Sequence, residues 1–231
     1  MLASSRPPAL VHPGARRSPA VVVRAAASTG TAAPAAAIDA LKRGVAQPGS
    51  VPAPAMLSAM LELERAKLSP EPWLASIEAP RARWRLIFTA DSKQVQAGQK
   101  KQPSKGGIFF PIPAVQKFDP VTKDFENGVF LGPIASLTFN GPYTMAGRQL
   151  SFDVRSMNIG LGPWRWSIAL KKDAKPLDQL PDSERKALPF FLYAYADGDI
   201  IVARGRSGGL AVWTRTTAEW EMNAGVAQVY K

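Results

Sequence analysis

The spacing of apolar residues changes once along this chain, from a helical period to a strand period. Before residue 83 they recur every three or four positions, as in an amphipathic helix. This spacing predicts a short helix over 36–46, with Ile38 and Leu41 on one face, and a longer helix over 55–68. From residue 83 onward, apolar and polar residues alternate, as in a half-buried strand. We therefore expect helices first and a β-domain after them.

The helix predicted over 55–68 has a broad apolar stripe, on which Leu57 and Leu61 are flanked by Met56 and Met60. Such a stripe could anchor the chain on a membrane surface or pack against the β-domain. Its polar face mixes charges of both signs, at Glu62, Glu64, Arg65 and Lys67. A membrane anchor is usually more basic, so this mixture favours packing.

The β-part begins with a strand at 83–90 and ends with three strands within 190–215. Between these come six further predicted strands, at 108–118, 125–131, 134–139, 143–145, 149–154 and 163–171. A polar loop is expected at 91–107, and a helical turn at 181–188. About eight to ten evenly spaced strands with turn signals between them predict one mainly β antiparallel barrel.

The last three strands form a meander whose turns carry distinctive residues. Asp197-Gly198 favours a two-residue hairpin with positive φ angles, and Ser207-Gly208-Gly209 marks the second reversal. Asp197 and Asp199 could form an acid–base pair, but a structural role is favoured, with Asp197 in the turn. In that interpretation Asp199 pairs with Arg204 or Arg206.

The charge of the chain differs between its N-terminal leader and the remainder. The net charge is +11, and residues 1–38 contain four arginines and no acidic residue, so the remainder carries +7. An Arg- and Ser-rich, acid-free leader is typical of an organellar transit peptide. The predicted organisation is a chloroplast transit peptide at 1–26, a linker with a short helix at 27–54, the barrel with its N-terminal helix at 55–218 and a tail at 219–231.

Few residues of the chain suit catalysis or metal binding. There is no Cys, and the one His, His12, lies in the leader. We therefore expect no enzyme activity, no metal site and no cofactor. Residues 205–209 match the G-x-S-x-G elbow of serine hydrolases. Strands are predicted on both sides of this motif, whereas an elbow needs a helix after it.

Large aromatic side chains on the predicted strands are the candidates for ligand binding inside the barrel. They are Trp84, Phe88, Trp164, Trp166 and Trp213. They either fill the interior or line a pocket for one small apolar ligand, and the sequence leaves both open. Lysines at 93–105 and 171–175 suit a solvated surface, lipid headgroups or nucleic-acid phosphates. Nucleic acid is the least favoured, because no RNA-recognition signature accompanies them.

Three stretches, in order, resemble the plastid lipid-associated protein (fibrillin) family. Leu-Glu-Leu-Glu at 61–64 and Trp-Arg-Leu-Ile-Phe-Thr at 84–89 are similar to the family's leucine–glutamate helix and W-x-L-x-Y-T strand, with Phe88 in place of Tyr. Phe-Glu-Asn-Gly-Val at 125–129 is similar to its I-x-N-x-V strand. The stretch 195–209 is similar to its Y-x-D-x-D-L-R-I-x-R-G-x-x-G hairpin, in which Asp197, Asp199, Arg204 and Gly205 would be structural. The family often has Arg where this chain has Ile201, so Arg204 is expected to take that role or the cross-barrel arginine is missing.

The resemblance implies a lipocalin-like barrel in the chloroplast, bound peripherally to plastoglobules or thylakoids. It also implies a non-enzymatic role in binding or coating apolar lipids such as isoprenoid quinones, carotenoids or acyl lipids. Two alternatives stay open: an accessory factor or enzyme of plastid isoprenoid metabolism, and a basic plastid RNA-binding module.

Overall fold

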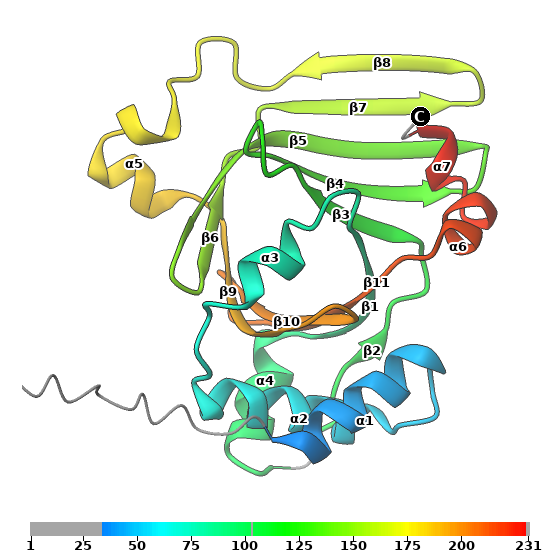
Figure 1. The fold of residues 1–231 in the computed structure, drawn as a ribbon, viewed down its shortest axis with the longest axis vertical. Coiled ribbons are helices and arrows are strands. Elements are labelled where there is room, and N and C mark those ends of the chain that lie inside the picture. Colours follow the sequence, from blue (N-terminus) through cyan, green and yellow to red (C-terminus); the bar gives the residue numbers. More distant parts are fainter. Residues whose placement is uncertain (1–33, 103, 230–231) are drawn as a thin grey trace, which may run out of the picture.

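A closed ring of eight antiparallel strands forms the centre of the structure, a computed structural model that describes residues 34–102 and 104–229 (Figure 1). In ring order the strands are β1 (Arg83–Ala90), β11 (Leu210–Arg215), β10 (Ile200–Gly205), β9 (Phe190–Ala196), β6 (Gln149–Phe152), β5 (Ala135–Ala146), β4 (Asp124–Leu131) and β3 (Ala114–Phe118). The prediction of a mainly β, lipocalin-like antiparallel barrel with N-terminal helices is confirmed. The transit peptide predicted at 1–26 lies outside the described residues.

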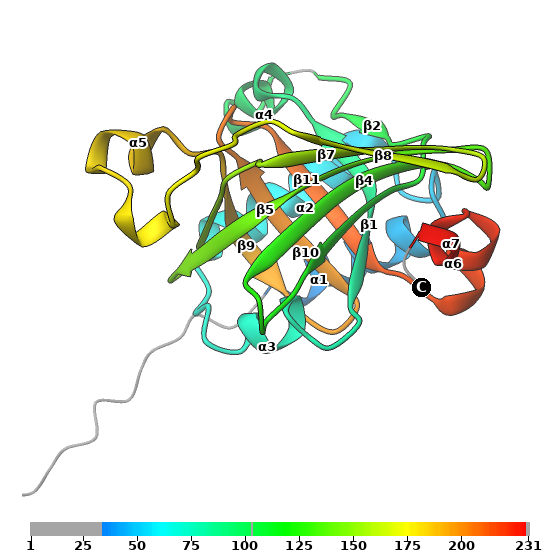
Figure 2. The same cartoon turned by 90° about the horizontal axis from the view of Figure 1, so that it is seen from above.

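Three further strands lie outside the ring, and two of them pair with it directly. The short strand β2 (Ile108–Phe109) pairs with β1. The strands β7 (Ser156–Leu161) and β8 (Trp164–Ala169) form a hairpin that pairs with the first half of β5. The second half of β5 pairs instead with β6, so the β7–β8 hairpin leaves the ring and extends the sheet outward (Figures 1 and 2).

The N-terminal helices α1 (Ala35–Ala46) and α2 (Ala53–Ala66) cover the barrel on the side of β9–β11 (Figure 1). Six residues of α2 are buried: Met56, Leu57, Ala59, Met60, Leu61 and Leu63. The apolar stripe of this helix therefore packs on the barrel and does not form a membrane-surface anchor. Helix α1, which corresponds to the short helix predicted over 36–46, belongs to the same core through Ala37, Leu41 and Val45.

Helix α4 (Ser92–Gln99) occupies part of the segment that was predicted as a polar loop. Asp91 starts it through a capping box, in which its carboxylate accepts from the Gln94 amide and the Gln94 side chain accepts from the Asp91 amide, each at 2.8 Å. A Cβ at Gly98 would lie 3.0 Å from Leu57 and from Leu61, so the glycine allows α4 to pack closely on α2.

Helix α3 (Trp73–Ile77) lies across one end of the barrel (Figure 1). Trp73 and Ile77 are buried, and the Ile77 carbonyl accepts a hydrogen bond of 3.1 Å from the indole N–H of Trp84. This end of the barrel is therefore closed by the chain itself.

The remaining helices lie at the periphery. The 3-10 turn η1 (Leu177–Gln179) and α5 (Asp182–Ala187) form an exposed excursion before β9. Where a tail was expected, α6 (Ala218–Asn223) and α7 (Val226–Val229) place Ala224 and Val226 against Val115 and Phe130, on the outer face of β3 and β4. Within the described part of the chain, no helix is long and apolar enough to cross a membrane.

Candidate ligand cavity

One half of the barrel interior, next to α3, is filled by side chains. Aromatic rings pack there edge to face or at a tilt, with centroids 5.3 Å apart for Phe118 and Tyr143 and 4.5 Å apart for Phe125 and Phe152. Trp84 belongs to this half, because it pairs with the inward-facing Gln116 and bonds to α3. The filled half therefore forms a floor.

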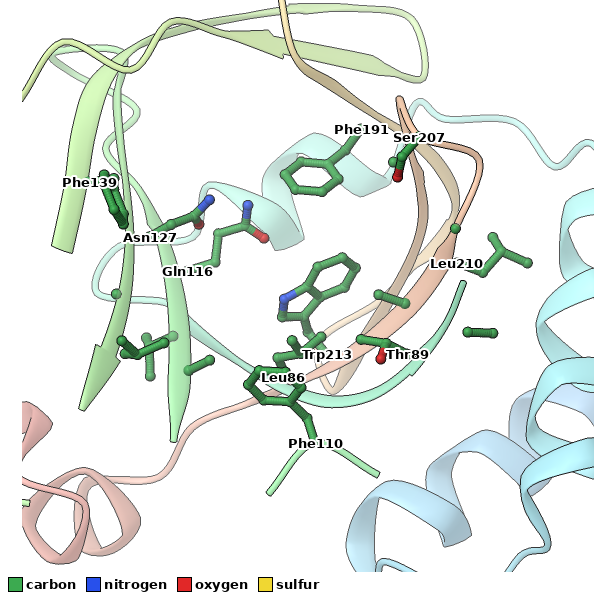
Figure 3. A pocket seen from close by; sticks show the side chains of 18 of the residues that line it. Leu86, Thr89, Phe110, Gln116, Asn127, Phe139, Phe191, Ser207, Leu210 and Trp213 are labelled. Atoms are coloured by element: carbon green, nitrogen blue, oxygen red, sulfur yellow. The ribbon is translucent and has the colours of Figure 1, made fainter. Parts of the chain in front are cut away.

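The other half of the interior forms an open cavity of about 510 Å3. This volume lies within the range of small-molecule sites. Large apolar residues line its walls, among them Leu86, Val129, Leu137, Phe139, Phe191 and Trp213. Figure 3 shows the Phe191 and Trp213 rings turned toward the same space, where their centroids are 5.6 Å apart. The interior is thus partly filled and partly hollow.

Polar side chains and turn glycines line the cavity at two levels. Asp91, Gly205, Ser207 and Gly209 lie where β1 ends and β10 turns into β11, and we refer to these four as the rim. The rim is at the barrel end opposite α3, since α3 precedes the start of β1. Gln116 and Asn127 lie deeper, on β3 and β4 (Figure 3).

Gln116 and Asn127 are directly opposite in the β3–β4 ladder, so their side chains share the inner face. Gln116 is 3% exposed, and its Oε1 has no hydrogen-bond partner among the described residues. Neither residue was predicted as a candidate from the sequence. The available signal was their spacing, since Gln116 is two residues from the inward-facing Phe118 and Asn127 is two residues from Phe125.

The predicted aromatic residues on β1 and β11 lie in three different environments. Trp213 is 7% exposed and lines the cavity, where its role in ligand binding stays a prediction. Trp84 is fully buried in the filled half, so it packs rather than lines the cavity. Phe88 lies outside the barrel, against Phe109. A bulge between Leu86 and Phe88 shifts the register, which turns Leu86 inward and Phe88 outward.

Trp164 and Trp166 were expected inside the barrel, and that placement is wrong. Both lie on β8, in the hairpin outside the ring, and are 62% and 49% exposed. Trp166 pairs with Ile159, which pairs with the cavity residue Leu137. Opposed residues of neighbouring strands share a face, so the tryptophans do lie on the face that continues from the barrel interior.

This face of the hairpin is apolar along its length. Its exposed members on β7 and β8 are Leu161, Trp164, Trp166 and Ile168, and we refer to these four as the hairpin face. Lys172 follows β8, whereas Lys171 is paired with Asp153. Arg165 lies on the opposite face, since it pairs with Gly160, and its guanidinium donates to the Gly162 and Trp164 carbonyls. The opposite face carries polar residues such as Asn158, whose amide bonds to Asn140 at 2.7 Å.

The Asp197 loop is structural, but two details differ from the prediction. Neither Asp197 nor Gly198 has a positive φ, because the loop spans three residues, and Asp197 Oδ1 accepts from the amides of Asp199 and Ile200, each at 2.8 Å. Asp199 does not pair with Arg204 or Arg206. It pairs with Lys42 of α1, whose Nζ lies 2.6 Å from Asp199 Oδ2 and 2.8 Å from Asp197 Oδ2.

The shared contact with Lys42 shifts the pKa values of its neighbours. Burial opposes ionisation of Asp197, but hydrogen bonds from Lys42 and from the backbone outweigh it, so the pKa of Asp197 lies below its usual value. Hydrogen bonds to Asp197 and then Asp199 raise the pKa of Lys42. Burial, followed by its hydrogen bond to Asp197, raises the pKa of Tyr195 to about 12.

Arg204 points outward rather than across the barrel. Its guanidinium forms a two-pronged ion pair with Glu64 of α2 and donates to the Gly208 carbonyl at 2.5 Å. It does not take the role of a cross-barrel arginine. Gly205 precedes the turn from β10 to β11 and lies at the cavity rim.

The cavity offers little that suits metal or hydrolase chemistry. In the ranges 34–102 and 104–229, no three acidic or His side chains gather as metal ligands. Ser207 lies in a turn between two strands, so the strand–turn–helix geometry of a nucleophile elbow is absent at this position. A scan against models of known protein families and a search of curated proteins each found no match to this chain.

Proposed function

We propose that this chain is a non-enzymatic plastid lipid-associated protein, whose barrel holds one apolar lipid and whose β7–β8 hairpin rests on a lipid surface. The single observation that carries the proposal is the cavity of about 510 Å3 with walls of large apolar side chains. Burying about 300 Å2 of ligand surface there would contribute roughly 7 kcal/mol at 25 cal/mol per Å2, before ordering costs.

The hairpin face supports the second part of the proposal. Exposed Trp side chains are suited to the interface of a lipid layer, where their rings enter the headgroup region, and the exposed Lys172 that follows β8 can meet an anionic headgroup. The apolar rows of β5, β7 and β8 run without interruption from the cavity wall to this face. A lipid could therefore pass from the surface to the cavity along one apolar path.

The chloroplast location, at plastoglobules or thylakoids, rests on the composition of residues 1–38 and on the family resemblance. Import assays with a fluorescent fusion of the full chain test it. Accumulation in plastids is expected, and a cytosolic signal would contradict it.

Floating the purified chain with liposomes distinguishes this proposal from its alternatives. Binding to anionic liposomes that persists in 0.5 M salt supports apolar insertion, since salt screens charge but not apolar burial. Retention on RNA that salt abolishes, without flotation, would favour the RNA-binding module. Conversion of an added isoprenoid quinone would favour an enzyme or accessory factor of isoprenoid metabolism.

A further inference from the structure

The buried amide of Gln116 indicates what kind of head group the cavity accepts. Gln116 pairs with Trp84 on one side and Asn127 on the other, so it stands where the filled half of the barrel meets the cavity. In Figure 3 the Gln116 and Asn127 amides project into the space bounded by Phe191 and Trp213. The floor of the cavity is therefore polar at one point, while its walls are apolar.

An amide in this position has a hydrogen-bonding requirement that the described chain does not meet. The Gln116 Oε1 is buried and has no hydrogen-bond partner within residues 34–102 and 104–229. A buried acceptor without a partner is costly, and such groups are rare in folded proteins. Leu or Met would fill the same space without that cost, so a polar side chain here suits a partner that arrives with the ligand.

We propose that the cavity takes an elongated apolar molecule ending in a hydroxyl group, with the hydroxyl on Gln116 and Asn127. This inference rests on the proposed lipid-binding function and narrows its ligand class. The ligand hydroxyl donates to Gln116 Oε1 and accepts from the Asn127 amide. The apolar remainder lies along Leu86, Phe139, Phe191 and Trp213 and points to the rim.

A hydroxyl fits this floor better than a hydrocarbon or ether end. It both donates and accepts, so it satisfies a pair of amides. A hydrocarbon or ether end would displace water from Gln116 and leave the acceptor unpaired. The structure thus favours phenols, hydroquinones, long-chain alcohols and hydroxylated polyenes over pure hydrocarbons and methyl ethers.

A matched pair of probes tests this directly. We would measure the affinity of the full chain for 4-nonylphenol and for 4-nonylanisole by titration calorimetry, below the concentrations at which they aggregate. The two differ in one methyl group, which removes the donor. The wild-type chain is expected to bind the phenol about tenfold more tightly, the gain of about one hydrogen bond.

The variant Gln116→Leu is expected to reduce this tenfold ratio to about one, with anisole binding kept or improved. Gln96→Leu is the matched control, because Gln96 is exposed on α4, away from the cavity lining. It should keep the ratio. If Gln116→Leu shows no cooperative melting transition, Gln116→Met takes its place and carries the same expectation.

The outcomes of these titrations distinguish a failure of this inference from a failure of the proposed lipid-binding function on which it rests. Equal affinity of the wild-type chain for both probes would overturn the hydroxyl preference and leave an apolar cavity. A preference that survives in both Gln116 variants would overturn the role of Gln116. Failure to bind either probe would contradict the proposed function itself.

Discussion

Arg204 of β10 and Glu64 of α2 face each other as a two-pronged ion pair, with Nε 2.5 Å from Oε1 and Nη2 2.6 Å from Oε2. The residues are 140 positions apart, and each side chain is about one-fifth exposed. The pair joins the N-terminal helices to the closing hairpin.

Glu64→Gln should lower the free energy of unfolding by about 1–3 kcal/mol, because it removes the charge that compensates a largely buried guanidinium. Urea denaturation of the full chain measures the change. Asp182→Asn is the control, since its pair with Arg185 on α5 is exposed and should contribute about 0.5 kcal/mol or less. Equal effects of the two substitutions would contradict a clamping role for Arg204.

Asp197 should make stability depend on pH in the acid range. Its pKa is lowered from 3.8 in the folded state, so its contribution is complete above pH 3.8 and is lost as pH falls through the folded value. Asp197→Asn keeps the oxygen that accepts from Asp199 and Ile200 but removes the charge that faces Lys42.

Wild type should therefore exceed Asp197→Asn in stability by about 1 kcal/mol at pH 7, and the difference should shrink below pH 3.8. Chemical denaturation at pH 7, 5, 4 and 3 measures it. A difference that is constant down to pH 3 would show that the charge of Asp197 is not responsible.

Trp84 and Trp213 should respond differently to truncation, although both face the barrel interior. Trp84→Ala removes a fully buried ring and its bond to Ile77, which should cost about 3–5 kcal/mol of stability. Trp213→Ala enlarges an existing cavity, so we expect a smaller loss of stability and a larger loss of ligand affinity. Thermal melting and probe titration measure the two effects, and a Trp84→Ala chain that melts like wild type would contradict the filled half of the barrel.

The double variant Trp164→Ala, Trp166→Ala should weaken binding to anionic liposomes at least tenfold and leave the melting temperature within a few degrees. The reason is that both rings are about half exposed or more and contribute little to the core. Val121→Ala is the matched control, because Val121 is 89% exposed on a turn outside the hairpin. Sedimentation with liposomes measures the change. Equal binding by both variants would show that the lipid contact lies elsewhere on the protein.

The alternation of apolar and polar residues predicted most strands and correctly grouped the apolar residues of 164–170 on one face. It could not predict that this face is left exposed to solvent. Trp164 and Trp166 are exposed because β5 changes partner halfway along, from β7 to β6. That switch depends on residues far away in the sequence. Phe88 faces outward for a local reason that is equally hard to predict from the sequence. One bulged residue reverses the alternation of inward-facing and outward-facing side chains along β1.

The candidate site was predictable in part. Trp213 could be identified because a large aromatic residue on a barrel strand either fills or lines the interior. Gln116 and Asn127 were missed because polar residues on strands are usually assigned to the solvent face. Helix α3 spans five residues among prolines, too short to show a period, so the closed floor that distinguishes a half-filled barrel from a full one could not be inferred.

The measurement that tests the central claim most directly is mass spectrometry of lipids extracted from the full chain, purified from plastids without detergent. Wild type should yield a hydroxyl-bearing apolar lipid at about one per protein. Ala211→Phe, which places a ring into the cavity, should yield little or none while melting normally. Absence of lipid from wild type, or equal recovery from both chains, would contradict a ligand-holding barrel.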